Sequence, residues 1–169
     1  MADDPTPIGR AESWFTSRGW SPFAFQREVW DAYLAGESGL IHAATGTGKT
    51  LAAWWGPILE WMREERERSE AEAIPAARKR RTSARESASP LRVIWVTPLR
   101  ALAADTLEAI SQPLRDLSIP WTVECRTGPN FSIVLRRTHA SSVRISASVR
   151  PVYAFAKGTS APSFQTAKV

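Results

Sequence analysis

Apolar residues change their spacing along the chain, and the change separates expected strands from expected helices. Short apolar runs typical of strands occur at residues 39–42, 91–96 and 121–126. The stretches expected to be helical are residues 7–19, 26–34, 50–62 and 99–117. Because strands and helices follow one another in this order, we predict an α/β fold with a parallel sheet flanked by helices.

Proline and tryptophan residues add detail to the prediction of the two longer helices. Pro57 lacks a backbone N–H, so we expect it to kink the helix over residues 50–62 or to end its first part. The helix over residues 99–117 is expected to be interrupted near Pro113. Three large side chains are expected in the core rather than on a stacking platform for bases: Trp54, Trp55 and Trp61.

The composition changes between residues 63 and 90. Arginine and glutamate are mixed in the first half, where pairing between them favours an extension of the preceding helix. The second half is rich in alanine, serine and basic residues, with Lys79, Arg80 and Arg81 at its centre. We therefore predict a mobile basic insertion over about residues 63–90, solvated rather than bound to nucleic acid.

A glycine-rich segment, AATGTGKT at residues 43–50, joins the first expected strand to the long helix. Glycine allows positive φ and brings bare N–H groups against phosphate oxygens, and the helix adds its positive end. We predict that Lys49 reaches the β- and γ-phosphates of ATP and that the Thr50 hydroxyl binds Mg²⁺. The alternative is a surface turn with a chance Lys-Thr pair. The residues expected to bind the nucleotide are Ala44, Thr45, Gly46, Thr47, Gly48, Lys49 and Thr50, with Lys49 and Thr50 catalytic.

Aromatic residues and a glutamine precede this loop, in WSPFAFQ at residues 20–26. An amide donates and accepts at once, so Gln26 can pair with the N6 and N7 edge of adenine. Phe23 or Trp20 could then pack on the base. Alternatively, the aromatic rings belong to the core and Gln26 caps a helix. Spacing alone does not separate these two interpretations.

Charge and composition narrow the class of protein. The formal net charge of +5 and the pI near 10 favour an anionic partner, with nucleic acid first. Cys125 is the single cysteine, so no internal disulfide can form and a reducing cytoplasm is expected. We find no signal peptide and no apolar stretch long enough to cross a bilayer, so no membrane partner is expected.

Together the motifs resemble the first motor domain of superfamily 2 DEAD/DEAH-box helicases. Alanine at the first position of the phosphate loop is common in the helicase form, and residues 97–103 match helicase motif Ia. The closer resemblance is to Lhr-type helicases, especially the ligase-associated DEXH-box DNA helicases of bacteria, and it covers about residues 8–128. The resemblance rests on Trp14-Phe15, FQRE at 25–28, ATGTGKTLAAW at 44–54, TPLRALAADT at 97–106 and RTG at 126–128.

This resemblance implies a RecA-like domain that uses ATP and Mg²⁺ and acts on DNA, or on an RNA–DNA hybrid, in DNA repair. A functional link to a DNA ligase is implied only by the family name. The residues that the resemblance places along the nucleic-acid backbone are Thr97, Pro98, Arg100, Arg126, Thr127 and Gly128. Such contacts position a strand without reading its sequence.

The resemblance has a limit, because a helicase motor needs an Asp-Glu pair to hold Mg²⁺ and orient water. No Asp-Glu dipeptide occurs in the chain, and no acidic residue follows Glu124. We therefore divide the chain into N-terminal helices with the glutamine motif (1–38), a partial motor domain (39–128) and an atypical tail of low order (129–169).

Two explanations of the tail are open. One is a frameshift just after Gly128, which the other reading frames of the gene would reveal. The other is a natural, divergent tail that binds nucleic acid, with a short strand around residues 143–149. The basic residues available for such binding are Arg136, Arg137, Arg144 and Arg150.

The expected function is an ATP-binding fragment of a DNA helicase that lacks the DEXH box and the second motor domain. We expect weak ATP binding at most and no unwinding by this chain alone. The alternatives are another phosphate-loop enzyme, such as a kinase, or a non-catalytic basic module that binds nucleic acid.

Overall fold

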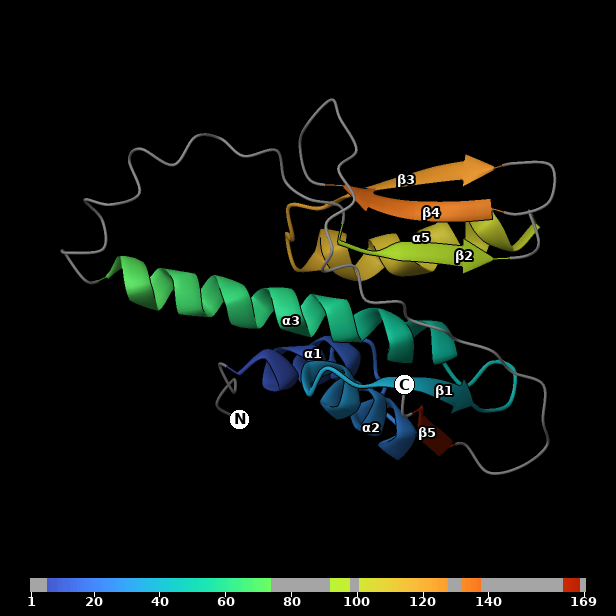
Figure 1. Cartoon of the computed structure of the whole chain (residues 1–169), viewed down its shortest axis with the longest axis horizontal. Helices are drawn as coiled ribbons and strands as arrows, with labels where there is room; N and C mark the ends of the chain where they lie inside the picture. Colours follow the sequence, from blue (N-terminus) through green and yellow to red (C-terminus); the bar gives the residue numbers. More distant parts are fainter. Residues whose placement is uncertain (1–5, 74–91, 98–100, 128–131, 138–162, 168–169) are drawn as a thin grey trace.

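The computed structural model describes residues 6–73, 92–97, 101–127, 132–137 and 163–167 (Figure 1). The described residues form helices and short strands, in keeping with the predicted α/β class. In chain order the elements are α1 (Pro7–Thr16), α2 (Ala24–Leu34), β1 (Ser38–His42), α3 (Lys49–Glu72), β2 (Ile94–Thr97), α5 (Ala101–Asp116), β3 (Thr122–Thr127), β4 (Ser132–Arg137) and β5 (Ser163–Ala167).

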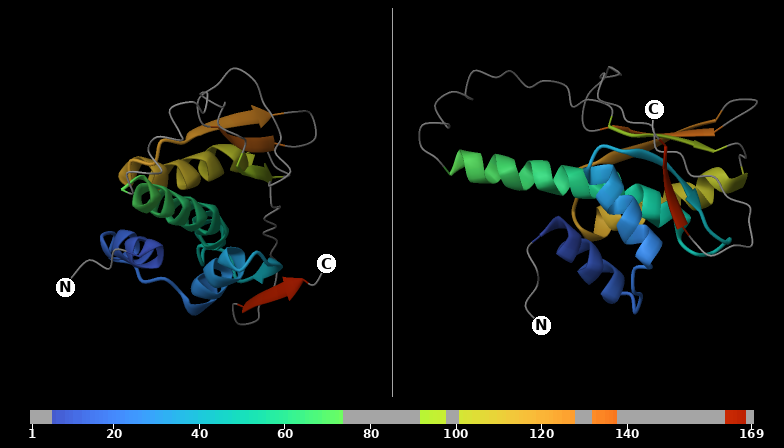
Figure 2. Two further views of the ribbon diagram at one scale, coloured as in Figure 1. Left: turned by 60° about the vertical axis from the view of Figure 1, so that its left-hand side comes forward. Right: turned by 60° about the horizontal axis from the view of Figure 1, so that its bottom comes forward.

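Helix α3 lies at the centre of the molecule. Helices α1 and α2 pack on one side of it with β1 and β5, and α5 with the other three strands lies on the opposite side (Figures 1 and 2). Helix α1 begins where Thr6 Oγ1 accepts a hydrogen bond from the Gly9 N–H, 3.1 Å away, and Pro7 occupies its first position. None of the described helices combines the length and the apolar character needed to cross a bilayer.

Helix α3 is longer than the sequence pattern predicts. It continues through Pro57 rather than ending there, and α5 likewise continues through Pro113. The last ten residues of α3 contain the Arg66–Glu70 pair at 3.5 Å and the Glu65–Arg68 pair. The extension of this helix predicted from charge pairing is therefore confirmed. Residues 63–72 belong to α3, as expected for the first half of the insertion. Residues 74–90 lie outside the described part, so the mobile loop predicted for the second half stays a prediction.

The strand pairings correct the predicted parallel sheet. Among the described residues the strands form two sheets, β1–β5 and β2–β4–β3, and every pairing is antiparallel. Strands β2 and β3 run in the same direction, as predicted, but β4 lies between them and runs the opposite way. Only four residues, 128–131, join β3 to β4, and a connection that short permits an antiparallel neighbour but no parallel crossover.

The second correction concerns the predicted structure of the tail, residues 129–169. We predict an irregular segment over residues 129–169, yet it supplies β4, which lies between β2 and β3, and β5, which pairs with β1. Strand formation there is possible because an open strand edge offers unpaired N–H and C=O groups to any extended segment nearby. The strand expected around residues 143–149 lies outside the described part.

Tryptophan dominates the core, as predicted. Trp54 and Trp55 are fully buried on α3, and the Trp54 indole Nε1 donates to the Ile110 carbonyl of α5 at 2.8 Å. Trp61 is partly buried and meets the Trp121 ring edge-on at 6.0 Å. Edge-to-face contacts of this kind stabilise aromatic cores beyond simple burial.

Candidate nucleotide-binding site

The phosphate-loop segment lies between β1 and α3, as predicted. Ala43 is 1% exposed, and the chain then emerges at Ala44. Gly46 has φ +86° and Gly48 has φ +79° with ψ +30°, so both occupy the left-handed region that favours glycine. Gly48 is the residue that precedes the first turn of α3. The two glycines therefore have the backbone conformations that the sequence pattern requires.

Side chains within the loop hold its shape. Lys49 Nζ donates to the carbonyl oxygens of Ala43 at 2.9 Å and Ala44 at 2.7 Å. Thr47 Oγ1 donates to the same Ala44 carbonyl at 2.8 Å. The ammonium group thus lies inside the loop, where its charge can reach an anion bound by the loop's main chain.

The start of α3 is electrostatically suited to an anion. Gly48 has no side chain to cap the helix, and no acidic residue occupies the first turn. The uncapped N–H groups and the aligned peptide dipoles therefore keep the positive end of the helix exposed to a ligand. Thr50 lies in this first turn and is half-buried. The residues present fit a bound triphosphate.

Gln26 reaches this loop from α2, although its side chain is only 2% exposed. Its Oε1 accepts the Phe23 N–H at 2.8 Å, and its Nε2 donates to the Gly48 carbonyl at 3.1 Å. The first contact is the helix cap that the sequence leaves open as an alternative. The second ties α2 to the phosphate loop. The predicted pairing with adenine stays a prediction.

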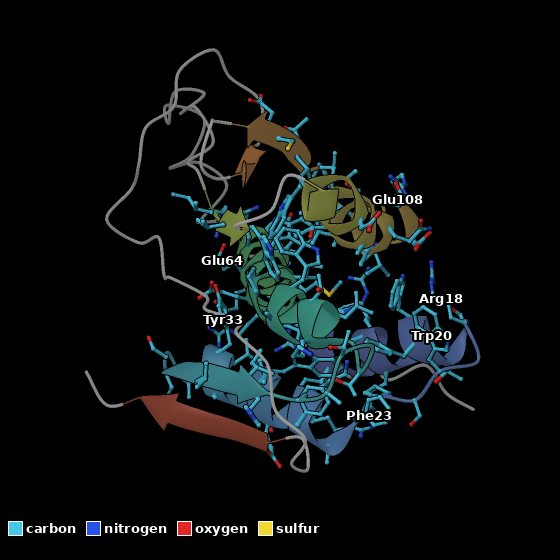
Figure 3. All side chains as sticks on the ribbon, turned by 90° about the vertical axis from the view of Figure 1, so that its right-hand side faces the viewer. Arg18, Trp20, Phe23, Tyr33, Glu64 and Glu108 are labelled. Carbon is cyan, nitrogen blue, oxygen red and sulfur yellow. The ribbon has the colours of Figure 1, made fainter. Side chains whose placement is uncertain are left out.

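Two aromatic side chains of the segment at residues 20–26 are exposed. Phe23 is 54% exposed (Figure 3). Its ring stacks on that of Phe25 with centroids 6.0 Å apart. Trp20 is 52% exposed and meets the ring of Trp14 edge-on at 6.1 Å. Phe23 therefore has an accessible ring at the start of α2, the helix that also carries Gln26.

The candidate nucleic-acid residues are placed only in part. Thr97 ends β2 and Thr127 ends β3, and both lie opposite Ser132 of β4. Arg126 precedes Thr127 on β3, so three of the predicted residues share one end of the sheet. Pro98, Arg100 and Gly128 lie outside the described part.

One loop residue outside the predicted nucleotide set, Ala43, also contacts Lys49. Its carbonyl oxygen holds Lys49, and its side chain is buried in the cluster that contains Ile41 and Ala52. A small apolar residue at the end of a buried strand is a weak signal for such a role. The Gly48–Gln26 contact has no sequence signal, since it joins residues 22 positions apart.

Comparison with known proteins identifies the family. The family model described as DEAD/DEAH box helicase matches residues 23–149, which is most of the chain. The chain belongs to the DEAD/DEAH box helicase family. Members use ATP and Mg²⁺ and act on nucleic acids, and their domain has a RecA-like α/β fold. The matched range includes the phosphate loop and extends past Gly128, where the motif resemblance ends.

Two curated relatives are Lhr helicases. The "Lhr helicase/uracil glycosylase" of Escherichia coli (strain K12) is 29% identical over 126 residues, covering 70% of this chain. The "Lhr helicase/ probable uracil glycosylase" of Mycolicibacterium smegmatis is 32% identical over 116 residues, covering 66% of it. The matches span 7% and 6% of those two proteins. No solved structure matches this chain.

Proposed function

We propose that this chain is the ATP-binding segment of an ATP-dependent DNA helicase of the Lhr type. The observation that supports it most is the phosphate loop between β1 and α3. There two glycines have positive φ, Lys49 turns into the loop, and the α3 N-terminus carries no cap and no acid. The kinase alternative leaves the TPLRALA segment at residues 97–103 without a role.

The chain's own residues would divide the binding of Mg²⁺–ATP among them. The main chain of residues 44–48 and the Lys49 ammonium would hold the phosphates, and the Thr50 hydroxyl would bind the metal. The exposed Phe23 ring would pack on adenine. Gln26 would hold Gly48 in place through its hydrogen bond to the Gly48 carbonyl. Bound Mg²⁺–ATP would supply the phosphoanhydride bond whose hydrolysis drives a helicase.

Titration of the isotope-labelled chain with Mg²⁺ and a non-hydrolysable ATP analogue tests this proposal. We expect the amide signals of residues 44–50 to shift, and Lys49→Ala to abolish the shifts. Arg115→Ala removes an equal charge from the exposed face of α5 and should leave them unchanged. The proposal fails if a folded sample shows no shifts in the loop.

Unwinding requires more than this loop. The chain contains no Asp-Glu pair, and no acid follows Glu124 to orient an attacking water. We therefore predict that the purified chain binds ATP weakly and displaces no strand from a DNA duplex. ATP-dependent strand displacement by the chain alone would overturn this prediction.

The proposed polymer substrate is DNA, and an RNA–DNA hybrid is the alternative duplex. Arg126 and Thr127 at the end of β3, with Thr97 at the end of β2, would hold the sugar-phosphate backbone together with Pro98, Arg100 and Gly128. Gel-shift titrations with both duplexes separate the two substrates. If binding is present but indifferent to nucleotide and to Lys49→Ala, a non-catalytic binding module is the better description. The role in repair and the link to a DNA ligase are part of the same proposal.

A further inference from the structure

Both ends of the Gln26 amide form hydrogen bonds inside the protein. Its Oε1 atom accepts the Phe23 N–H at 2.8 Å, and its Nε2 atom donates to the Gly48 carbonyl at 3.1 Å. The amide keeps one further hydrogen and one further lone pair. Gln26 is only 2% exposed, however, so a base that approaches from solvent does not reach them. Pairing with the N6 and N7 edge of adenine would require Gln26 to leave this buried position.

The Gly48 carbonyl shows what the contact from Gln26 does. The same oxygen accepts a second hydrogen bond, from the Ala52 N–H at 2.9 Å, at the start of α3. Two donors on one oxygen fix the plane of the peptide between Gly48 and Lys49. Because a trans peptide points its N–H away from its C=O, the Lys49 N–H is directed toward the phosphate loop. Gln26 therefore influences phosphate binding through the orientation of this peptide.

The base of a bound nucleotide meets a different kind of surface. The Phe23 ring, at the start of α2, is 54% exposed and is the accessible ring next to the buried amide. A ring that packs on a base contacts its π-face, which every base has, so stacking tolerates a change of base. Adenine and guanine differ at position 6, where one has an amino group and the other a carbonyl. Stacking alone does not distinguish these two groups.

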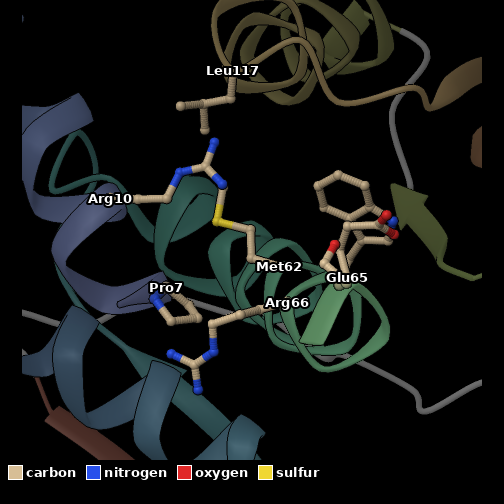
Figure 4. Close-up of a pocket in the computed structure, with 8 residues that line it drawn as sticks. Pro7, Arg10, Met62, Glu65, Arg66 and Leu117 are labelled. Atoms are coloured by element: carbon tan, nitrogen blue, oxygen red, sulfur yellow. The ribbon is translucent and has the colours of Figure 1, made fainter. Parts of the chain in front are cut away.

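The pocket between α1, α3 and the end of α5 lies too far away to contact the base (Figure 4). It has a volume of about 300 Å³, and its lining includes Trp61 and Met62 of α3. Met62 lies 13 residues after Lys49, which corresponds to about 20 Å along the helix. This pocket therefore supplies no specificity to a nucleotide whose phosphates are held at residues 44–50.

We infer that Gln26 positions the phosphate loop and leaves the base edge uncontacted, so the site accepts purine nucleoside triphosphates without selecting adenine. This inference rests on the proposed function, because it concerns the same site. The group that the site recognises is the magnesium triphosphate, held by the main chain of residues 44–48 and by the Lys49 ammonium. The purine packs on Phe23, and the identity of its position-6 group does not matter.

Three probes on the ¹⁵N-labelled full chain test base selection. They are the magnesium complexes of non-hydrolysable ATP and GTP analogues and of tripolyphosphate, which has no base. The amide signals of residues 44–50 report binding. We expect the two nucleotide analogues to bind within about twofold of each other. Binding of the ATP analogue that is tighter by about fivefold or more, as expected of an amide paired with adenine, would overturn the inference and leave the proposed function intact.

Gln26→Met tests the positioning role, because methionine is uncharged and of similar length but has no amide. Titrations are run well below the melting temperature of the variant. All three probes should bind about fivefold more weakly, as expected for a lost buried hydrogen bond. Weakening of the ATP analogue alone would assign Gln26 to the base. Unchanged binding of tripolyphosphate would leave Gln26 a purely structural role, and either result overturns the inference.

Two controls make the outcome decisive. Gln112→Met removes an amide that donates to Asp116 at 3.1 Å on α5, and it should leave all three affinities unchanged. In the absence of ligand, Gln26→Met but not Gln112→Met should shift the Lys49 amide signal, since the peptide before Lys49 loses one of its two donors. The comparison of ATP with GTP analogue in the wild type decides on base selection even if Gln26→Met does not fold. Loop signals that stay unmoved by every probe in the folded wild type would overturn the proposed function, and this inference with it.

Discussion

Lys49 illustrates how the phosphate loop is held together by its own residues. Its ammonium donates to two backbone carbonyls of the loop, Ala43 and Ala44, so the charge is held inside the loop by neutral partners. The two ammonium–carbonyl hydrogen bonds are charge-assisted on the donor side only, and a phosphate would add the attraction of a negatively charged acceptor. Phosphate oxygens can therefore compete with the two carbonyls for the ammonium.

Gly48 has two separate reasons to be glycine. Its φ of +79° costs an L-residue about 1–2 kcal/mol, and an added Cβ would lie 2.9 Å from Gln26 Nε2. Gly46 has φ +86° but open space around the added Cβ. We predict that Gly48→Ala lowers the melting temperature more than Gly46→Ala, because only the former displaces Gln26.

Calorimetric melting of both variants measures this difference. Adding Gln26→Ala to Gly48→Ala should cost less than the sum of the two single changes, since the clash is then absent. Equal melting temperatures for Gly46→Ala and Gly48→Ala would show that the Gln26 contact does not constrain the loop.

For single residues, the sequence predicts the phosphate loop better than it predicts the contacts that hold the loop in place. Glycine at positions 46 and 48 and lysine at 49 have a spacing that only a phosphate loop explains well. Gln26 could not be assigned from sequence, because capping a helix and pairing with adenine use the same amide atoms. Only the folded structure places that amide between Phe23 and Gly48.

Among the elements, α2 and α3 approach each other closely at Gly56. A Cβ built on Gly56 would lie 2.6 Å from Cγ of Tyr33, so the α2–α3 contact requires glycine there. Helix propensity alone would favour alanine by about 1 kcal/mol. We predict instead that Gly56→Ala destabilises the chain by about 1–3 kcal/mol, as overpacking does.

Urea unfolding followed by tryptophan fluorescence measures this free energy. Gly56→Ala combined with Tyr33→Ala, which removes the Cγ and Cδ2 atoms that the new Cβ would meet, is the matched control and should cost less than the sum of the two single changes. A gain in stability for Gly56→Ala would contradict the requirement for glycine between α2 and α3.

The ends of α1 and α5 are tied together by Asp116. Its carboxylate accepts a hydrogen bond from the Trp14 indole at 2.9 Å and pairs with Arg18, whose guanidinium lies over the Trp14 ring. Burial raises the pKa of Asp116, but the Trp14 hydrogen bond, the Arg18 charge and the Gln112 hydrogen bond outweigh it. The pKa of Asp116 is therefore below the ordinary value of 3.8.

The lowered pKa of Asp116 determines how this carboxyl group changes stability with pH. A carboxyl group whose pKa is lowered by folding stabilises the chain above pH 3.8, and that contribution is lost as the pH falls through the folded-state pKa. We predict that the melting temperature of the wild type falls more steeply between about pH 5 and pH 3 than that of Asp116→Asn. Trp14→Phe keeps the carboxylate but removes one donor, so its slope should be intermediate. Parallel curves for wild type and Asp116→Asn would contradict the assignment.

For the whole molecule, the sequence predicts the strands but not their partners. The apolar runs at residues 39–42, 91–96 and 121–126 correspond to β1, β2 and β3 within a few residues. Hydrophobic pattern cannot identify which segment pairs with them, because backbone hydrogen bonds carry no sequence signature. Residues 132–137 and 163–167 therefore escape prediction, although they supply β4 and β5.

The contribution of β4 to stability tests whether the tail, residues 129–169, is part of the native fold. In the register, Val134 lies opposite Trp95 of β2 on one side and Cys125 of β3 on the other. Proline at this central position removes a ladder N–H and leaves its acceptor unpaired, at a cost of about 1–3 kcal/mol. We predict that Val134→Pro lowers the melting temperature strongly, whereas Val134→Thr, which keeps the N–H and the β-branch, lowers it little.

Thermal unfolding monitored by circular dichroism measures both variants. Sensitivity to Val134→Pro but not to Val134→Thr favours a natural tail, since a frameshifted segment has no selected pairing to lose. A Val134→Pro variant that melts like the wild type would mean that β2 and β3 are stable without β4. The frameshift explanation would then be the stronger one, and the other reading frames downstream of Gly128 should contain an Asp-Glu pair after an apolar strand.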